Sequence, residues 1–212
     1  MKRLVRFVVV VLVIGAIALC VYRYRVELGL VHPATSQESA NSEQPSSGPH
    51  PAHIVWQALD RSPDGFKVEM PTGTRQTQIP AFDERGNVDR VDMIYAYPDS
   101  QTTFAVIWAD NPPVERASRD GADRTLDLAR DGALARTQAT LTGESRAQRD
   151  GFPARDFSGR NEGGGILNAR MILAGRRLYM LIAAFPASSA RSDEDVNRFF
   201  DSFSLTSAAR ND

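Results

Sequence analysis

The chain has 212 residues and a formal net charge of −1, from 25 basic and 26 acidic side chains. This balance gives the protein no electrostatic reason to bind nucleic acid or an anionic lipid surface. Its single cysteine, Cys20, excludes an intrachain disulfide, so a folded domain must depend on its hydrophobic core.

An apolar run near the amino terminus predicts a membrane anchor. Residues 7–22 (FVVVVLVIGAIALCVY) carry no charge, and the span extends to about residues 5–22. A membrane-spanning helix needs about 20 apolar residues, with about 17 near the lower limit. Three basic side chains precede the run and two follow it, which favours a cytoplasmic amino terminus. Residues 1–27 are therefore predicted as the signal anchor of a single-pass inner-membrane protein with a periplasmic, extracytoplasmic body.

Two other outcomes for this segment compete with a retained anchor. Residues 16–18 form an A-x-A pattern that suits signal cleavage after Ala18. The apolar character continues through Val21, however, and cleaved signals become polar soon after the cut. Lipid attachment to Cys20 is disfavoured because Leu19, rather than a small residue, precedes it. The retained anchor is the favoured prediction, with cleavage as the alternative.

The next segment predicts a flexible linker over residues 28–53. Within it, residues 31–53 (VHPATSQESANSEQPSSGPHPAH) are rich in Ser and Pro and have no aromatic residue or hydrophobic period. A globular domain is expected over residues 54–206, followed by a disordered tail at residues 207–212. The first 53 residues hold five basic and three acidic side chains, so the remainder has a net charge of −3.

The globular part contains a series of predicted strands joined by turn residues. Residues 178–185 (LYMLIAAF) are apolar on both faces, which predicts a central strand covered on both sides. Pro98-Asp99-Ser100 and residues 174–177 predict hairpin turns. The predicted strands span residues 65–70, 90–97, 102–108, 152–158, 165–173 and 178–185.

Two helices are predicted, at residues 120–139 and from residue 192 onward. The first places an apolar stripe on one face, formed by Ala122, Leu126, Ala129 and Ala133. In the second, Val196, Phe199, Phe200 and Phe203 recur at i, i+3, i+4 and i+7, which indicates packing against a sheet. The order of elements predicts an α+β fold, an antiparallel β-sheet with two packed helices.

Three segments resemble a known family. GFKVEMP (65–71), RMILAGRRLYMLIAAFP (170–186) and FFDSFSL (199–205) look like small bacterial exported or membrane-tethered domains of the PsbP-like α+β sandwich type. In those domains a GF-x-V-x-x-P strand opens the fold and a helix ending F-x-x-SF closes it. The resemblance covers roughly residues 54–206 and rests on packing motifs. It implies a fold and an extracytoplasmic accessory role, and it transfers no catalytic residue.

The histidine and cysteine positions restrict the chemistry of the domain. His32, His50 and His53 all lie in the predicted linker, and residues 54–206 contain neither histidine nor cysteine. Ser-His and Cys-His catalysis and histidine or cysteine metal sites are therefore excluded there. His50 and His53 lack a third fixed ligand, so linker composition explains them better than metal binding. No catalytic, cofactor-binding or metal residue is predicted, and no cofactor.

Acidic and glycine-rich stretches offer weaker signals. Asp123, Asp127 and Asp131 share one helix face, which suits either a cation or, because arginines are interleaved, a solvated face with salt bridges. Residues 83–89 hold calcium-ligand residue types without the alternating spacing, and predict a hairpin loop. Gly163-Gly164-Gly165 precedes a strand and has no lysine nearby, so it predicts a turn rather than a phosphate site.

Two functions from different classes remain. The favoured one is a membrane-anchored extracytoplasmic accessory or interaction domain of the bacterial cell envelope, without catalysis, that contacts lipid through its N-terminal helix and an envelope protein through an exposed apolar patch. The alternative is a tethered small-ligand-binding or carboxylate-based enzymatic domain. That alternative predicts a concave pocket of several hundred Å³ with converging Asp, Arg and Tyr side chains, in which Trp56 and Trp108 are further candidates.

Overall fold

The computed structural model describes residues 53–82, 88–110, 119–188 and 193–210. The predicted anchor at residues 5–22, nearly all of the linker and most of the acidic loop at 83–89 lie outside these ranges. Within the described part of the chain, no helix combines the length and apolar character needed to cross a membrane.

The described strands form two antiparallel sheets, and the fold class is α+β as predicted. The small sheet has the order β1-β2-β10 and the large sheet the order β3-β4-β5-β9-β8-β7-β6. Four helical segments accompany them. In chain order the elements are β1 (Trp56–Arg61), η2 (Ser62–Asp64), β2 (Phe66–Pro71), β3 (Arg75–Phe82), β4 (Val88–Ala96), β5 (Thr103–Asp110), α3 (Arg119–Thr137), β6 (Ala139–Arg149), β7 (Phe152–Asn161), β8 (Gly165–Ala174), β9 (Arg177–Pro186), α4 (Asp193–Ser202), β10 (Ser204–Leu205) and α5 (Ser207–Arg210).

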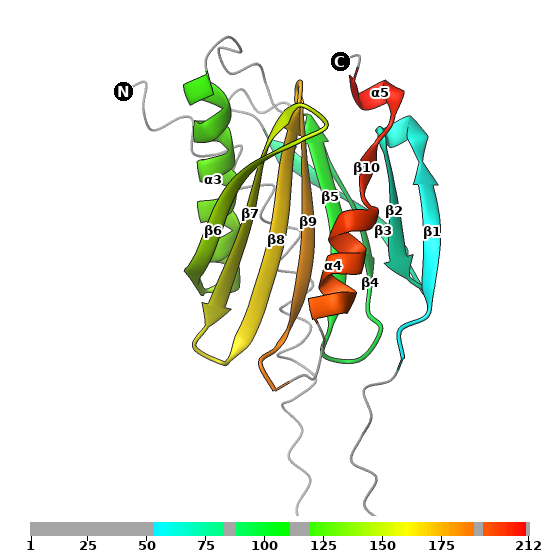
Figure 1. Ribbon diagram of the computed structural model, residues 1–212, viewed down its shortest axis with the longest axis vertical. Helices are drawn as coiled ribbons and strands as arrows, with labels where there is room; N and C mark the ends of the chain where they lie inside the picture. Colours follow the sequence, from blue (N-terminus) through cyan, green and yellow to red (C-terminus); the bar gives the residue numbers. More distant parts are fainter. Residues whose placement is uncertain (1–52, 83–87, 111–118, 189–192, 211–212) are drawn as a thin grey trace, which may run out of the picture.

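The large sheet lies between two covering layers (Figure 1). Helix α3 packs on one face, where it contacts β6, β7 and β8. Helix α4 and the small sheet cover the other face, and α4 also contacts β2. Two buried clusters result, one on each side of the large sheet.

Strand β9 is the central strand of the large sheet, as the two-sided apolar run predicts. Tyr179 and Leu181 are fully buried in the cluster beneath α4. Met180 and Ile182, which alternate with them, are 2% and 3% exposed in the cluster beneath α3. Both faces of this strand are therefore covered, which explains the absence of polar alternation.

The apolar stripes of both predicted helices face the core. Leu126, Ala129 and Ala133 of α3 are buried. In α4, Phe199 is fully buried and its ring meets that of Phe104 edge-on, with centroids 5.2 Å apart. The aromatic stripe is thus a packing surface, as predicted.

Four strands were not predicted from the sequence. β1, β3, β6 and the two-residue β10 lack an alternating apolar pattern, and each is an edge strand of its sheet. The first helix was also predicted too long, because it ends at Thr137 and β6 begins at Ala139. Gln138 has φ of 52°, a left-handed conformation that ends the helix without a glycine or proline signal.

Residues 207–210 form the short helix α5 rather than the start of a disordered tail. Ala209 is 4% exposed, and the Thr206 backbone N–H donates to the Gly65 carbonyl oxygen at 2.8 Å. These contacts tie the chain end to the turn before β2. The sequence SAAR gave no apolar period from which this packing could be inferred.

The predicted turns at residues 174–177 and 163–165 are present. Gly175 and Arg176 connect β8 to β9, with Ala174 paired to Arg177, and Gly175 has φ of 58°. Between β7 and β8, the Gly164 N–H donates to the Asn161 carbonyl oxygen at 3.0 Å. The Gly-rich segment is therefore a turn that leads into a strand.

Candidate functional site

A groove of about 490 Å³ opens on the α4 side of the large sheet. Its floor comes from β6, β7 and β8, because α4 leaves part of their polar surface uncovered. Helix α4 supplies the wall through Val196, Asn197 and Phe200. The polar side chains that line the floor include Ser145, Asp156, Ser158, Asn168 and Arg170.

Arg170 on β8 organises the inner end of this groove. Its Nε and Nη2 atoms donate to the two carboxylate oxygens of Asp156, each at 3.0 Å. Nη1 donates to the Phe200 carbonyl oxygen at 2.9 Å and to Asp201 Oδ1 at 3.0 Å. The guanidinium also lies over the Phe200 ring, 5.2 Å from its centroid. One arginine thus joins the sheet to the last turn of α4.

This arginine stays charged although it is 8% exposed. Burial lowers the pKa of Arg170, but its hydrogen bonds to Asp156 and Asp201 act in the opposite direction and raise the pKa above its ordinary value. Because its partners hold the guanidinium on several sides, Arg170 serves as a structural cation rather than a free acid or electrophile.

The remainder of the floor is uncharged and polar. Ser158 Oγ donates to Asn168 Oδ1 at 2.8 Å, across the β7–β8 pair. Asn197 projects from the exposed part of α4 at the groove wall. Hydroxyl and amide groups of this kind bind peptide or other polar ligands by hydrogen bonds without supplying a nucleophile–base pair.

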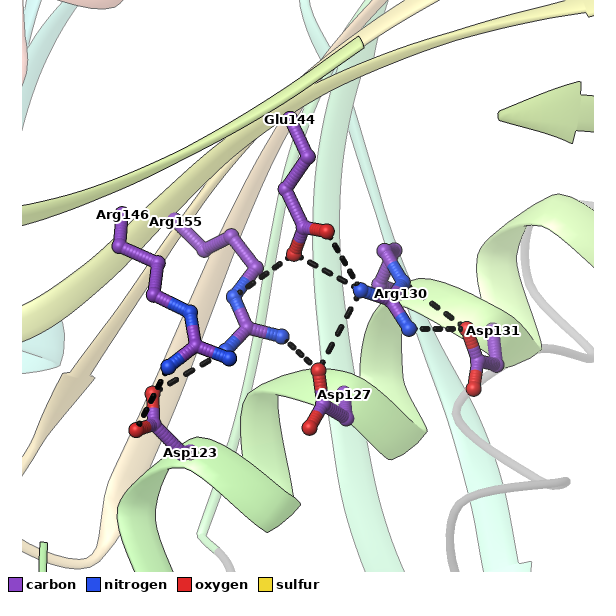
Figure 2. Close-up of polar contacts among 7 residues, drawn as sticks. All are labelled: Asp123, Asp127, Arg130, Asp131, Glu144, Arg146 and Arg155. Carbon is purple, nitrogen blue, oxygen red and sulfur yellow. Dashed lines mark hydrogen bonds and ion pairs between the residues drawn. The ribbon is translucent and has the colours of Figure 1, made fainter. Parts of the chain in front are cut away.

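The opposite side of β6 and β7 carries an ion network with α3. Arg155 on β7 is fully buried, and its guanidinium contacts three carboxylates (Figure 2). Nη2 lies 3.1 Å from Asp123 Oδ1, Nη1 binds Asp127, and Nε is 3.0 Å from Glu144 Oε1. The Nε–Glu144 contact is an ion pair without a well-aligned hydrogen bond.

Arg130 extends the same network along α3. Its Nη1 donates to both carboxylate oxygens of Glu144, at 2.8 and 2.7 Å, and its Nη2 is 2.8 Å from Asp131 Oδ1. Asp127 and Asp131 therefore form salt bridges with an interleaved arginine, as predicted for this acidic face. Arg155 was not predicted from the sequence, because its partners come from α3 and β6.

Strand β6 belongs to both sites and forms one edge of the large sheet. Nine of its eleven residues are exposed. It is hydrogen-bonded to β7 on one side, with a register irregularity between Leu141 and Gly143. On its other side β6 has no strand partner among the described strands.

Other candidates from the sequence belong to the core or to the surface. Trp108 is 3% exposed and its ring meets Phe66 edge-on at 5.1 Å, while Trp56 packs in the same way against Phe104 at 5.5 Å. Neither tryptophan lines the groove. In the described ranges, no three His, Cys, Asp or Glu side chains are grouped in a way that could hold a metal ion.

The comparisons with known proteins give structural neighbours only. No protein-family model and no curated protein sequence matches the chain. The structure is similar to the solution structure of cyanobacterial PsbP (CyanoP) from Synechocystis sp. PCC 6803, with a TM-score of 0.49 and 13% identity over 78% of this chain and 98% of that one. It is also similar to the Saccharomyces cerevisiae Ran-binding protein Mog1p, with a TM-score of 0.40 and 7% identity over 74% and 99% of the two chains.

A PsbP protein thus stands among the structural neighbours, in line with the resemblance read from the sequence. Both TM-scores are below 0.5.

A sequence signal for the missed residues did exist. Arg170 interrupts the otherwise apolar strand GILNARMILA, and Arg155 stands in β7 next to the buried Ala154. An arginine at such a position needs carboxylate partners, because its unpaired burial is unfavourable. The identity of those partners was not available from local spacing.

Proposed function

We propose that this chain is a non-catalytic accessory domain of the bacterial cell envelope, anchored in the inner membrane by residues 5–22, with residues 54–206 binding a protein partner on the periplasmic side. The anchor and the linker are inferred from sequence. The binding role rests on one structural observation, the open polar groove beside the exposed edge strand β6.

The chemistry of the groove favours binding over catalysis. Its charged floor residues, Asp156 and Arg170, are bonded to each other, and Arg170 is further held by the end of α4. Its other floor groups are serine hydroxyls and the Asn168 amide. General acid–base catalysis requires a titratable side chain that is free to contact substrate, and Asp156 and Arg170 are instead engaged with each other and with the end of α4.

One observation favours the alternative of a small-ligand site, namely the groove volume of about 490 Å³. The groove brings aspartate and arginine together, but no tyrosine appears among the described residues that line it. Its open form fits a segment lying along the sheet better than an enclosed small molecule.

Two measurements test the proposal. Full-length protein should remain in the membrane pellet after an alkaline wash, and protease added to spheroplasts should digest its domain. A photo-crosslinking amino acid at Asn197, on the groove wall, should give a discrete crosslinked protein in intact cells. The same probe at the exposed Arg176, in the β8–β9 turn, is the matched control. Soluble mature protein, protection from protease, or equal crosslinking at both positions would contradict the proposal.

A further inference from the structure

We propose that the outer edge of β6 is a strand-addition site, which takes up an extended basic segment of a partner protein and directs alternate side chains of that segment into the neighbouring groove. This inference rests on the proposed interaction role and specifies how the partner binds. Peptides that add to a sheet edge gain affinity from backbone hydrogen bonds and specificity from pockets for alternate side chains.

The length and exposure of β6 make it suitable for this purpose. The strand has eleven residues, Ala139–Arg149, of which nine are exposed. An edge of this kind presents a row of unpaired N–H and C=O groups, and natural proteins usually protect it with proline, lysine, a bulge or a covering element. β6 contains neither proline nor lysine, and its single irregularity lies between Leu141 and Gly143. The run from Glu144 to Arg149 pairs regularly with β7.

The charged side chains of β6 do not block strand pairing at its edge, because each forms an ion pair with another residue of the domain. Glu144 is held by Arg130 and Arg155. Arg146 Nη1 lies 3.2 Å from Asp123 Oδ2, and Arg149 Nη2 lies 3.6 Å from Asp156 Oδ2. These pairs direct the charges toward the two faces of the sheet. The backbone edge between the faces therefore remains available for a partner.

The other sheet edges are less suitable. β3, at the far edge of the large sheet, contains Pro80, which has no N–H to donate to an incoming strand. β1 has six residues, four of them partly buried, and β10 has two residues. Among the described strands, β6 offers the longest uninterrupted edge.

The groove supplies the side-chain specificity. Gly143 and Ser145 of β6 lie on its rim, so a strand paired beyond β6 would direct alternate side chains toward the α4 face. Asp156 of the floor is already bonded to Arg170, so the exposed Asp193 at the start of α4 is the lining carboxylate that would attract a basic side chain. A long lysine or arginine side chain reaches such groups with its aliphatic part along the sheet.

Charge also selects this occupant over a second copy of the chain. Residues 54–212 have a net charge of −3, so two copies repel each other. Although β6 itself carries Arg146 and Arg149, acidic residues outnumber basic ones in the groove lining, and a basic segment is attracted there. The attraction is modest and falls with salt. Backbone pairing along β6 is then expected to provide most of the binding.

The first test uses synthetic peptides and full-length protein in detergent micelles. The probe is a fluorescein-labelled peptide of nine residues that alternates Val and Lys, with binding followed by fluorescence anisotropy. We expect saturable binding, at least tenfold tighter than that of the matching Val–Glu peptide. Two N-methylated versions, one on odd and one on even residues, separate backbone pairing from charge. Because the N–H groups of successive residues in a strand point to opposite sides, only one version should lose binding.

The second test changes the edge itself. The N–H groups of Ala147 and Gln148 point to opposite sides of β6, one toward β7 and one outward. Either Ala147→Pro or Gln148→Pro removes the N–H that points outward. That variant should unfold at the same thermal midpoint as the unsubstituted protein and bind the Val–Lys peptide at least tenfold more weakly. Asp193→Asn should weaken the Lys peptide and leave the Val–Glu peptide unchanged.

Several results would overturn this inference. One is the absence of saturable binding at millimolar peptide, and a second is equal affinity for both N-methylated peptides. A third such result is that whichever of the two proline variants stays folded binds the Val–Lys peptide as tightly as the unsubstituted protein. A concentration-dependent dimer by analytical ultracentrifugation that the outward proline abolishes would assign the edge to a second copy instead. If in-cell crosslinks form at Asn197 while the peptides fail, the interaction role stands and strand addition is wrong. If both fail, the proposed function is also wrong.

Discussion

The buried guanidinium of Arg155 lies 3.1 Å from the Asp123 carboxylate (Nη2 to Oδ1), although the two residues are 32 positions apart. This pair fastens β7 to α3. The same guanidinium binds Asp127 and Glu144, so that one fully buried side chain links the helix to two strands, including the edge strand β6 (Figure 2). The position of the candidate binding edge therefore depends on a long-range ion network.

Replacement of Arg155 by methionine should destabilise the domain strongly. The methionine fills part of the space but leaves Asp123, Asp127 and Glu144 without their shared cation, and breaking a buried ion pair on one side costs about 3 kcal/mol or more. Urea unfolding of the full chain measures the change in the free energy of unfolding. Arg146→Met is the matched control, because that side chain is 66% exposed, and it should change stability by at most about 0.5 kcal/mol. Similar losses in both variants would contradict the special role of Arg155.

Arg170→Lys should loosen α4 although it keeps the charge. A single ammonium group does not reproduce the two-pronged contact with Asp156 together with the bond to the Phe200 carbonyl. We expect a loss of about 2 kcal/mol and faster hydrogen exchange in the amides of α4. Arg198, also on α4, forms a half-exposed ion pair with Glu69 of β2. Arg198→Lys should change the free energy of unfolding by about 0.5 kcal/mol or less. Unchanged exchange in α4 would show that Arg170 does not hold the helix.

Alanine substitutions at two glycines with similar φ angles distinguish the cost of backbone strain from the cost of a steric clash. Gly65 and Gly73 have φ of +89° and +80°, so alanine is strained at both. At Gly65 the new Cβ would collide with the Tyr179 hydroxyl and lie 2.9 Å from the Ala209 Cβ, whereas at Gly73 it meets nothing within 4 Å. Gly73→Ala should cost about 1 kcal/mol and Gly65→Ala about 3 kcal/mol, measured by thermal or urea unfolding.

The double variant Gly65→Ala with Tyr179→Phe tests the cause of that difference. Removal of the Tyr179 hydroxyl loses its hydrogen bond to the Asp64 carbonyl oxygen, 2.9 Å long, but also removes the collision. The double variant should therefore lose less stability than the two single variants added together. Strict additivity would mean that the hydroxyl is not the obstacle.

Asp60 should titrate well below an ordinary aspartate. It lies opposite Lys67 in the β1–β2 pair, with Lys67 Nζ 2.6 Å from Asp60 Oδ2. Hydrogen bonds from Lys67, and then from the Ser62 hydroxyl and N–H, lower the pKa of Asp60 to about 2. A depressed folded-state pKa contributes stability that is present above pH ~4 and is lost as the pH falls toward 2.

NMR titration of the Asp60 side-chain carboxyl measures this pKa directly. Lys67→Met should raise the Asp60 pKa, while the Ser62 hydrogen bonds keep it below that of an unfolded chain. Asp60→Asn should remove the corresponding part of the stability change between pH 4 and 2. An Asp60 pKa near ~3.9 in the unsubstituted protein would contradict the expected role of the pair.

The elements that bury a regular apolar face could be located from the sequence. The two-sided run LYMLIAAF indicated the central strand β9, and the spacing of Val196, Phe199 and Phe200 indicated the packed face of α4. These patterns are local, because burial of one face repeats every two residues in a strand and about every 3.6 in a helix. The α+β class followed from the order of such segments.

The edge strands and the charged sites required the folded chain. β6 is exposed along most of its length, so it has no apolar period that could distinguish it from a loop or the end of a helix. Arg155 meets Asp127 and Asp123 at separations of 28 and 32 residues, and Arg170 meets Asp201 at 31. Side-chain types and local spacing record whether a residue is buried, but a charge acts on whichever group the fold brings within a few ångströms. The amino-acid sequence therefore determined the layers of this protein, and their packing in three dimensions created the groove, the ion network and the open edge beside them.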